Sequence, residues 1–339
     1  MLSIEPLGLL HGQAARDAIE RRLALPLAGG PAAFSLVRLP GDPRGIVPVA
    51  LIPAEHRPAL ARITAARPTF AGLPGTGPWV MALLTVPPDS FSDGGQHATT
   101  EAAIAAAHAM HEAGADLIDI GGESTRPGAT PVTPDEEQAR ILPVIRVLSA
   151  SGLTVSVDTR HASTMRAALA AGARIINDIS ALTGDPEAAA VVAAARAPVI
   201  LMHMRGTPQT MSEHTSYADV AAEVVRELAD RVAAAEAAGI ARADIAIDPG
   251  IGFAKENPAS IELLDRLPVL HNLGCRILAG VSRKRFIGAL TGEPIAARRM
   301  PGSLAAALTA LDRGATILRV HDVGETVQAL RVWRGMNIS

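Results

Sequence analysis

Polar side chains recur at the ends of short apolar runs in this chain, and their types suit a flat heterocycle joined to an anion. Asp158, Asn177 and Asp248 each end a run rich in Val and Ile, and they offer donors and acceptors for amide- and guanidine-like edges. Positive charge for a phosphate or diphosphate comes from Arg126, Lys284, Arg319 and His321. Glycine-rich stretches at 86–95 and 121–128 would add backbone N–H groups to such an anion site.

Each of these residues taken alone is weak evidence for a site. An Asp after a strand is commonly the N-cap of the next helix, and a single His is more often a satisfied core residue than a catalyst. It is the recurrence of polar residues at one strand end after another, including Asp178 and His203, that predicts one shared site.

The use of lysine and cysteine adds two smaller observations. Lysine occurs only at Lys255 and Lys284, whereas all other basic residues are Arg, so each Lys mildly suggests a place that needs a compact point charge. Cys275 is the single cysteine and cannot form an internal disulfide, so we expect a small buried apolar residue there.

The elements that must position the polar residues alternate regularly from about residue 79 onward. Each apolar run is followed by an Ala-rich amphipathic stretch that ends at Gly, which is the pattern of βα units. The predicted strands are 79–85, 116–120, 154–158, 174–178, 199–203, 244–248, 276–282 and 316–321, and the clearest helices are 101–113, 134–149, 163–171, 217–238 and 303–313. Eight such units in about 260 residues predict an α/β fold of the (β/α)8 TIM-barrel type. A doubly wound sheet is the alternative, although no Gly-x-Gly-x-x-Gly follows an early strand.

Residues 1–76 do not follow this alternation. They contain a possible helix at 12–25, apolar runs at 33–39 and 47–52, and several prolines. We therefore predict two parts, an N-terminal α/β extension of unknown role (1–76) and a barrel (77–339). The extension could be a small appendage or a cap across the bottom of the barrel.

Composition excludes several classes of protein. The 339 residues are 48% hydrophobic and 19% charged, which supports a full core, and the net charge of −3 provides no overall field for nucleic acid. No signal peptide or uninterrupted apolar span is visible, so we expect a cytoplasmic protein that binds small molecules, with no nucleic acid and no membrane as partners.

The motifs at the strand ends resemble those of one known family. The chain contains Pro88-Asp89-Ser90-Phe91-Ser92-Asp93-Gly94-Gly95, Asp119-Ile120-Gly121-Gly122-Glu123-Ser124-Thr125-Arg126-Pro127-Gly128, Val157-Asp158-Thr159, Ile176-Asn177-Asp178-Ile179, Leu201-Met202-His203-Met204-Arg205-Gly206, Asp248-Pro249-Gly250-Ile251-Gly252-Phe253, Ser282-Arg283-Lys284 and Arg319-Val320-His321-Asp322-Val323. In this order over residues 77–335, they resemble the dihydropteroate synthases, the pterin-binding barrels of folate biosynthesis.

The resemblance implies a transferase that condenses 6-hydroxymethyl-7,8-dihydropterin diphosphate with 4-aminobenzoate, forming 7,8-dihydropteroate and pyrophosphate. Carried over, the pterin-binding residues are Asp158, Asn177, Met202, Asp248 and Lys284, and the diphosphate-binding residues are Thr85, Arg319 and His321. The residues implied for 4-aminobenzoate are Phe91, Thr125, Arg126, Pro127, Phe253 and Arg285. Asp158, Lys284, Asp89 and Arg126 would take part in catalysis. The resemblance also implies Mg²⁺ near Thr85, a homodimer and inhibition by sulfonamides.

Three departures from the family pattern bear on activity. Thr85 stands where the family has the Asn that helps to bind Mg²⁺ and diphosphate, Pro87 follows where the family has Thr, and Arg285 stands where the family usually has Ser. Ile251 and Ala254 also differ, which we interpret as repacking of the pocket wall. The alternatives are a non-catalytic or regulatory pterin-binding paralogue, a related enzyme that uses another arylamine, and a methyltransferase domain of the same pterin-binding barrel type.

Overall fold

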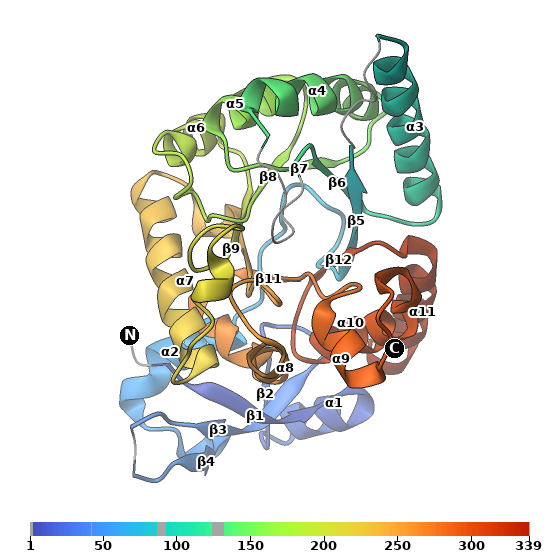
Figure 1. Ribbon diagram of the computed structural model, residues 1–339. Coiled ribbons are helices and arrows are strands. Elements are labelled where there is room, and N and C mark those ends of the chain that lie inside the picture. The colour runs from blue at the N-terminus through green and yellow to red at the C-terminus, as the bar shows by residue number, and fades with distance from the viewer. Residues whose placement is uncertain (1–2, 42, 87–92, 124–131, 339) are drawn as a thin grey trace.

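The computed structural model describes residues 3–41, 43–86, 93–123 and 132–338, with only the backbone for 93–98. Within them, eight parallel strands form a closed barrel in the order β10-β11-β12-β5-β6-β7-β8-β9, with helices around it (Figure 1). The strands are β5 (Trp79–Thr85), β6 (Leu117–Gly121), β7 (Val155–Asp158), β8 (Ile175–Asp178), β9 (Val199–Met202), β10 (Ile245–Asp248), β11 (Arg276–Ala279) and β12 (Ile317–Val320). The predicted (β/α)8 barrel is confirmed, and the doubly wound alternative is wrong.

Seven of the eight predicted strands match within one residue at each end. The exception is β11, which ends at Ala279 rather than at residue 282. The chain leaves the strand direction after this point, and Arg283 lies in the left-handed region at φ 57°.

The outer helices bury their apolar faces against the strands. They are α3 (Asp93–Glu112), α4 (Pro134–Ala150), α5 (Ala162–Ala170), α6 (Ala188–Ala195), α7 (Val220–Ala237), α8 (Asn257–Asp265), α9 (Arg285–Thr291), α10 (Met300–Asp312) and α11 (Val323–Asn337). Helix α4 begins at a capping box, in which the Thr133 side chain accepts from the Glu136 N–H and the Glu136 side chain accepts from the Thr133 N–H. Helix α7 begins three residues later than predicted, because Asp219 caps it by accepting from the Ala222 N–H.

The N-terminal extension is a four-stranded antiparallel sheet with two helices, placed beside the barrel (Figure 1). It comprises β1 (Glu5–Leu10), α1 (Gly12–Glu20), β2 (Leu25–Pro26), β3 (Ala33–Arg38), β4 (Ile46–Pro48) and α2 (Arg57–Thr64). The expected helix over 12–25 is wrong beyond Glu20, because Arg22 adopts φ 60° and the chain turns back. The sheet packs near η5 (Leu267–Leu273), the short 3₁₀ segment that precedes β11.

The segment after α2 crosses the N-terminal end of the barrel. Phe70 and Leu73 are buried there in one cluster with Trp79, Met81 and other inward residues of the strands. Arg276 binds this segment through the backbone carbonyls of Pro68 (2.9 Å) and Thr76 (2.9 Å). The barrel floor is therefore filled by residues that precede its first strand.

None of the helices in the described ranges is long and apolar enough to span a membrane.

Candidate active site

An enclosed pocket lies at the carboxyl ends of the barrel strands. It is lined by Leu83, Asp158, Asn177, Ile179, Met202, Asp248, Gly250, Ile251, Phe253, Gly280, Ser282, Lys284, Arg319 and His321. All five residues expected to hold a heterocycle are among them, and so are Arg319 and His321, which were expected to hold an anion.

The period of two along a strand explains why these residues meet. Ile175, Ile200 and Ala246 point inward and form part of the apolar floor. Two residues later on the same strands stand Asn177, Met202 and Asp248, so their side chains also point inward, one layer closer to the mouth. Ile317 and Arg319 repeat the relation on β12.

Arg319 joins two carboxylates across the barrel. Its Nε lies 2.6 Å from Asp119 Oδ2 and its Nη2 lies 2.7 Å from Asp158 Oδ2. Asn177 Nδ2 donates to the same Asp119 oxygen at 3.0 Å. Burial raises the pKa of Asp158 to about 7, the Arg319 charge opposes that rise, and Asp119 adds to it. The mouth therefore holds a carboxyl group poised to change charge near neutral pH.

Sequence reasoning did not assign Asp119 to the site. Its side chain is fully buried, and its Oδ1 has no hydrogen-bond partner among the described residues. Because a buried carboxylate oxygen without a partner is costly, this acceptor suits a donor such as a buried water. The sequence feature that could have identified Asp119 is its position two residues after the inward-facing Leu117, because alternate residues of a strand point to the same side.

Lys284 and Asp248 form the second charged part of the pocket. Burial lowers the pKa of Lys284 to about 8, an effect that the Asp248 charge partly offsets. The Lys284 ammonium lies 4.2 Å from the centre of the Phe253 ring, a cation–π distance. Asp248 is buried, and its Oδ1 accepts from the Gly250 N–H at 2.7 Å.

His321 lies at the rim with Ser282, another residue that sequence reasoning did not assign. The His321 Nδ1 atom lies 2.9 Å from Ser282 Oγ. Beside them, Arg283 pairs with Asp322, its Nε lying 3.1 Å from Oδ2. These contacts fix the imidazole next to Arg319, so the two residues can present positive charge and donors to one anion.

Comparisons with known proteins agree with this geometry. Residues 81–321 match the family described as "Pterin binding enzyme". The dihydropteroate synthase of Neisseria meningitidis serogroup B is 45% identical over 267 residues, covering 77% of this chain and 94% of that protein. The Xanthomonas albilineans dihydropteroate synthase with 4-aminobenzoic acid is 53% identical, with a TM-score of 0.71, covering 76% of this chain and 93% of the other. The structure of the same enzyme in complex with 7,8-dihydropteroate is 50% identical, with a TM-score of 0.69 and the same coverage.

The chain belongs to the dihydropteroate synthase family of pterin-binding enzymes.

Several residues that the family resemblance implies lie outside the pocket described above or outside the described side chains. Thr85 is exposed at the end of β5, and Arg285 is exposed at the first turn of α9. Asp89, Phe91, Thr125, Arg126 and Pro127 lie outside the described residues, as does Pro87.

Two polar residues at strand ends have other roles. Asp178 accepts from the N–H groups of Ser180 (2.7 Å) and Leu182 (2.8 Å), so it stabilises the turn after β8. His203 turns away from the pocket toward Glu227 and Lys255. Neither lines the pocket, and the Asp178 contacts are those of an ordinary turn.

A protein-built metal centre is not visible in the part of the chain that the structure describes. No group of three or more His, Cys, Asp or Glu side chains there could hold a metal ion. The exposed Thr85 hydroxyl is a single oxygen ligand, which fits only a cation that brings most of its ligands with it.

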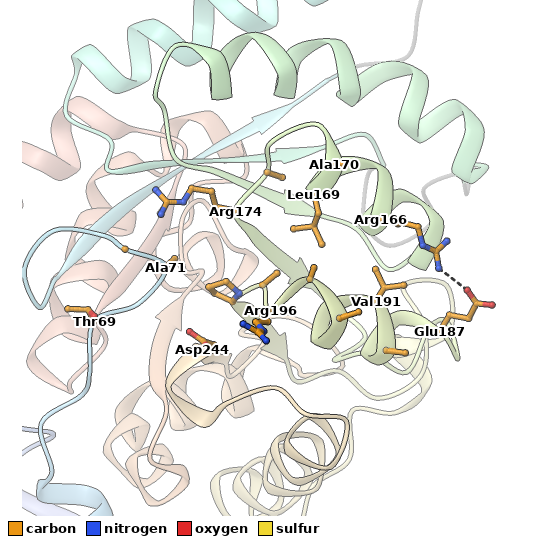
Figure 2. Close-up of a pocket in the computed structure, with 17 residues that line it drawn as sticks. Thr69, Ala71, Arg166, Leu169, Ala170, Arg174, Glu187, Val191, Arg196 and Asp244 are labelled. Atoms are coloured by element: carbon orange, nitrogen blue, oxygen red, sulfur yellow. Dashed lines mark hydrogen bonds and ion pairs between the residues drawn. The ribbon is translucent and has the colours of Figure 1, made fainter.

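A second, wider groove opens at the opposite end of the barrel (Figure 2). Alanines of α5 and α6 line it together with Arg166, Arg174 and Arg196, and Arg166 is paired with Glu187 at 3.2 Å. Its strand-side residues precede β8, β9 and β10, so it is remote from the catalytic mouth. We assign it no part in the reaction.

Proposed function

We propose that this protein condenses 6-hydroxymethyl-7,8-dihydropterin diphosphate with 4-aminobenzoate, forming 7,8-dihydropteroate and pyrophosphate. The observation that carries the proposal is the pocket itself, which brings Asp158, Asn177, Asp248 and Lys284 together with Arg319 and His321 in one lining. Such a pocket suits a pterin ring joined to a diphosphate. Family membership supports the same reaction.

The pterin ring would lie among the buried polar residues. Its guanidine-like edge donates N–H groups, which suit the carboxylates of Asp158 and Asp248. Asn177 and Lys284 would bind its carbonyl and ring nitrogens, and Met202 would pack against one face of the ring.

The diphosphate would lie near Arg319 and His321. The Arg319 Nε and Nη2 atoms bind Asp119 and Asp158, so Nη1 is the nitrogen best placed for a phosphate oxygen. We also propose that Mg²⁺ accompanies the diphosphate, with the Thr85 hydroxyl as a protein ligand. The ion would neutralise charge on the leaving group.

The chemistry breaks one C–O bond and forms one C–N bond. The diphosphate leaves with the electron pair of the C–O bond, the amine nitrogen bonds to the pterin methylene carbon, and one amine proton is lost. A pterin-methyl cation would form between these steps. An ionised Asp158 near that carbon would stabilise the developing positive charge.

The aminobenzoate would enter beside Phe253, which lines the pocket, with its carboxylate toward Arg285, the first residue of α9. Phe91, Thr125, Arg126 and Pro127 would complete this pocket, and Asp89 and Arg126 would close over the reacting groups. Excluding water there protects the cation from hydrolysis.

A different arylamine is the second candidate substrate. Arg285 lines a separate groove with Gly252, Ala254 and Asn257, and this groove lies next to Phe253. An arylamine with an anionic extension at its para position would place its extra charge against Arg285. The acceptor is then larger than 4-aminobenzoate, whereas the reaction stays the same.

The test is pyrophosphate release from dihydropterin diphosphate by the purified protein, with and without 4-aminobenzoate and with and without Mg²⁺. We expect release that requires the arylamine, with dihydropteroate as product. An Asp158→Asn variant provides a matched control for the site. Tight pterin binding without release would instead indicate the non-catalytic paralogue.

We further propose a cytoplasmic homodimer that sulfonamides inhibit, on the basis of family membership alone. Light scattering of the purified protein would test the oligomeric state.

A further inference from the structure

Lys255 is a buried lysine that the proposed reaction does not use. Its side chain is 1% exposed and lies directly behind the pocket wall. Its Nζ is 3.2 Å from the Gly250 carbonyl, 3.0 Å from the Phe253 carbonyl and 2.8 Å from His203 Nδ1. Gly250 and Phe253 both line the pocket. Lys255 therefore holds the turn that forms one wall of the pocket.

Three close acceptors surround the Lys255 ammonium, and the His203 carbonyl is a fourth, longer contact at 3.5 Å. A lysine ammonium has three N–H groups, and three acceptors surround it at 3.2 Å or less. His203 Nδ1 must then accept, so its proton is on Nε2, which lies 2.9 Å from Glu227 Oε2 and donates to it. With His203 in this tautomer, a neutral lysine would have only two N–H groups for these three acceptors.

Glu227 keeps its charge at the far end of this chain of contacts. Burial alone would raise its pKa, but hydrogen bonds from His203 and Arg205 lower the pKa to about 2. Arg205 binds it through Nε at 3.1 Å and also stacks 4.0 Å from the Tyr217 ring centre. Helix α7 carries Glu227, so the contacts join the pocket wall to an outer helix.

The turn itself leaves little room for movement. Gly250 adopts φ 66°, and a Cβ on it would lie 2.0 Å from the His203 carbonyl oxygen. Its N–H donates to Asp248 Oδ1, and its carbonyl accepts from Lys255. Any shift of the Gly250 peptide would therefore change the orientation of the Asp248 carboxylate in the pocket.

We propose that Lys255 is a positioning residue for the pterin pocket, holding the 249–253 turn against His203 so that Asp248 and Phe253 keep their places. The chain Lys255–His203–Glu227 ties this turn to α7. The proposal rests on the proposed function in that it takes pterin as the ligand of the pocket.

The charge of Lys255 is sensitive to its surroundings. Burial lowers its pKa to about 7, with Asp248 and Glu227 opposing this and Lys284 and Arg205 adding to it. His203 is kept neutral mainly by burial, which lowers its pKa. Loss of the third Lys255 proton above neutral pH would free one backbone carbonyl of the turn. Pterin affinity should then weaken on the alkaline side.

The experiment compares Lys255→Met, Glu227→Gln and a matched control, Glu236→Gln. Glu236 lies on the same helix and pairs with Arg242, remote from Lys255. The probe is 6-hydroxymethyl-7,8-dihydropterin diphosphate in the absence of arylamine, titrated from pH 6 to pH 9. Hydrogen exchange of the peptide that spans 246–256 reports on the turn without any ligand.

We expect Lys255→Met to weaken pterin binding at least tenfold, with kcat at saturation changed less than threefold, and to speed exchange in the turn. Glu227→Gln should shift the alkaline midpoint of binding to lower pH, whereas Glu236→Gln should not. This shift keeps the test valid if Lys255→Met fails to fold.

Wild-type-like binding in Lys255→Met, or equal midpoints in the two Glu variants, would overturn the positioning role. Failure of the wild-type protein to bind pterin would instead overturn the proposed function. In that case, unchanged exchange of the 246–256 peptide in Lys255→Met would still overturn the role of Lys255.

Discussion

Arg319 reaches across the barrel mouth to Asp158, with its Nη2 2.7 Å from Oδ2, while its Nε binds Asp119 at 2.6 Å. One cation thus stands between two buried carboxylates, and the cluster carries a net negative charge when both are ionised. Asp119 and Asp158 raise the pKa of Arg319 above its usual range, although burial alone would lower it. The guanidinium therefore stays charged, whereas burial raises the pKa of Asp158 to about 7.

Removal of the Arg319 side chain should destabilise the protein and abolish turnover. Arg319→Met leaves two buried carboxylates without their shared cation, and breaking such a buried pair costs about 3–5 kcal/mol. Urea unfolding measures the loss. Arg319→Lys keeps the charge but not the two-pronged geometry, so it should recover part of the stability. Equal unfolding midpoints for Arg319→Met and wild type would contradict the role of this ion pair.

Pterin binding should strengthen as the pH rises from 5.5 toward 7 and Asp158 ionises, because the ionised carboxylate is the better acceptor for the pterin N–H groups. The weakening expected from Lys255 is a separate, opposite effect on the alkaline side. The folded-state pKa of Asp158 is raised, so its contribution to stability is greatest below pH 4 and is lost as the pH rises through 7. Titration calorimetry between pH 5.5 and pH 7.5 tests the binding limb. In Asp158→Asn, pterin affinity should not rise over this pH range. If it rises as in the wild type, a group other than Asp158 causes the increase.

The inward direction of the polar side chains at the strand ends could be predicted from sequence, because the alternation of side chains along a strand determines it. A side chain two residues beyond an inward apolar residue also points inward, and this rule applies to Asn177 and Asp248 alike. The same rule applies to Asp119, which follows Leu117 by two residues. Asp119 lies one residue before the end of the predicted strand 116–120, so it is not among the residues that end a strand, which were the ones assigned to the site.

Long-range contacts could not be predicted in the same way. Lys255 and His203 are 52 positions apart, and Glu5 and Arg266 are 261 apart, so no local period connects them. The rarity of lysine drew attention to Lys255 but did not indicate its partners. Such contacts depend on how whole elements pack, and this information is not carried by any single segment.

Thr85→Asn should raise turnover or Mg²⁺ affinity. The Asn side chain replaces the Thr85 hydroxyl with an amide carbonyl, which reaches further and is the more strongly polarised oxygen ligand for Mg²⁺. The Mg²⁺ dependence of pyrophosphate release measures this effect. Thr85→Val removes the hydroxyl at nearly constant volume and should weaken the dependence. Identical Mg²⁺ curves for all three proteins would mean that Thr85 does not contact the ion.

Arg285→Ser should make the enzyme more sensitive to sulfonamides. We expect wild-type inhibition to be weaker than in relatives with Ser, because we propose that the exposed Arg285 faces the aminobenzoate pocket. The measurement is the sulfonamide concentration that halves turnover at fixed 4-aminobenzoate. Arg298→Ser, a change in the neighbouring segment, provides a control that should leave this value alone. Equal inhibition of Arg285→Ser and wild type would show that Arg285 does not affect sulfonamide binding.

Glu5→Gln should destabilise the whole chain, because Glu5 joins the N-terminal extension to the barrel. Its carboxylate is almost fully buried and binds Arg266 at 2.7 and 3.0 Å and Arg38 at 2.8 Å, and Arg266 in turn binds Asp219, the cap of α7. Loss of hydrogen bonds between charged groups costs about 1.5–3 kcal/mol, so the free energy of unfolding should fall by roughly that amount. Asp265→Asn is the matched control, because it removes the charge of an exposed partner of Arg313 and should cost at most about 1 kcal/mol. If the two variants unfold at the same urea concentration, the extension is not held to the barrel by Glu5.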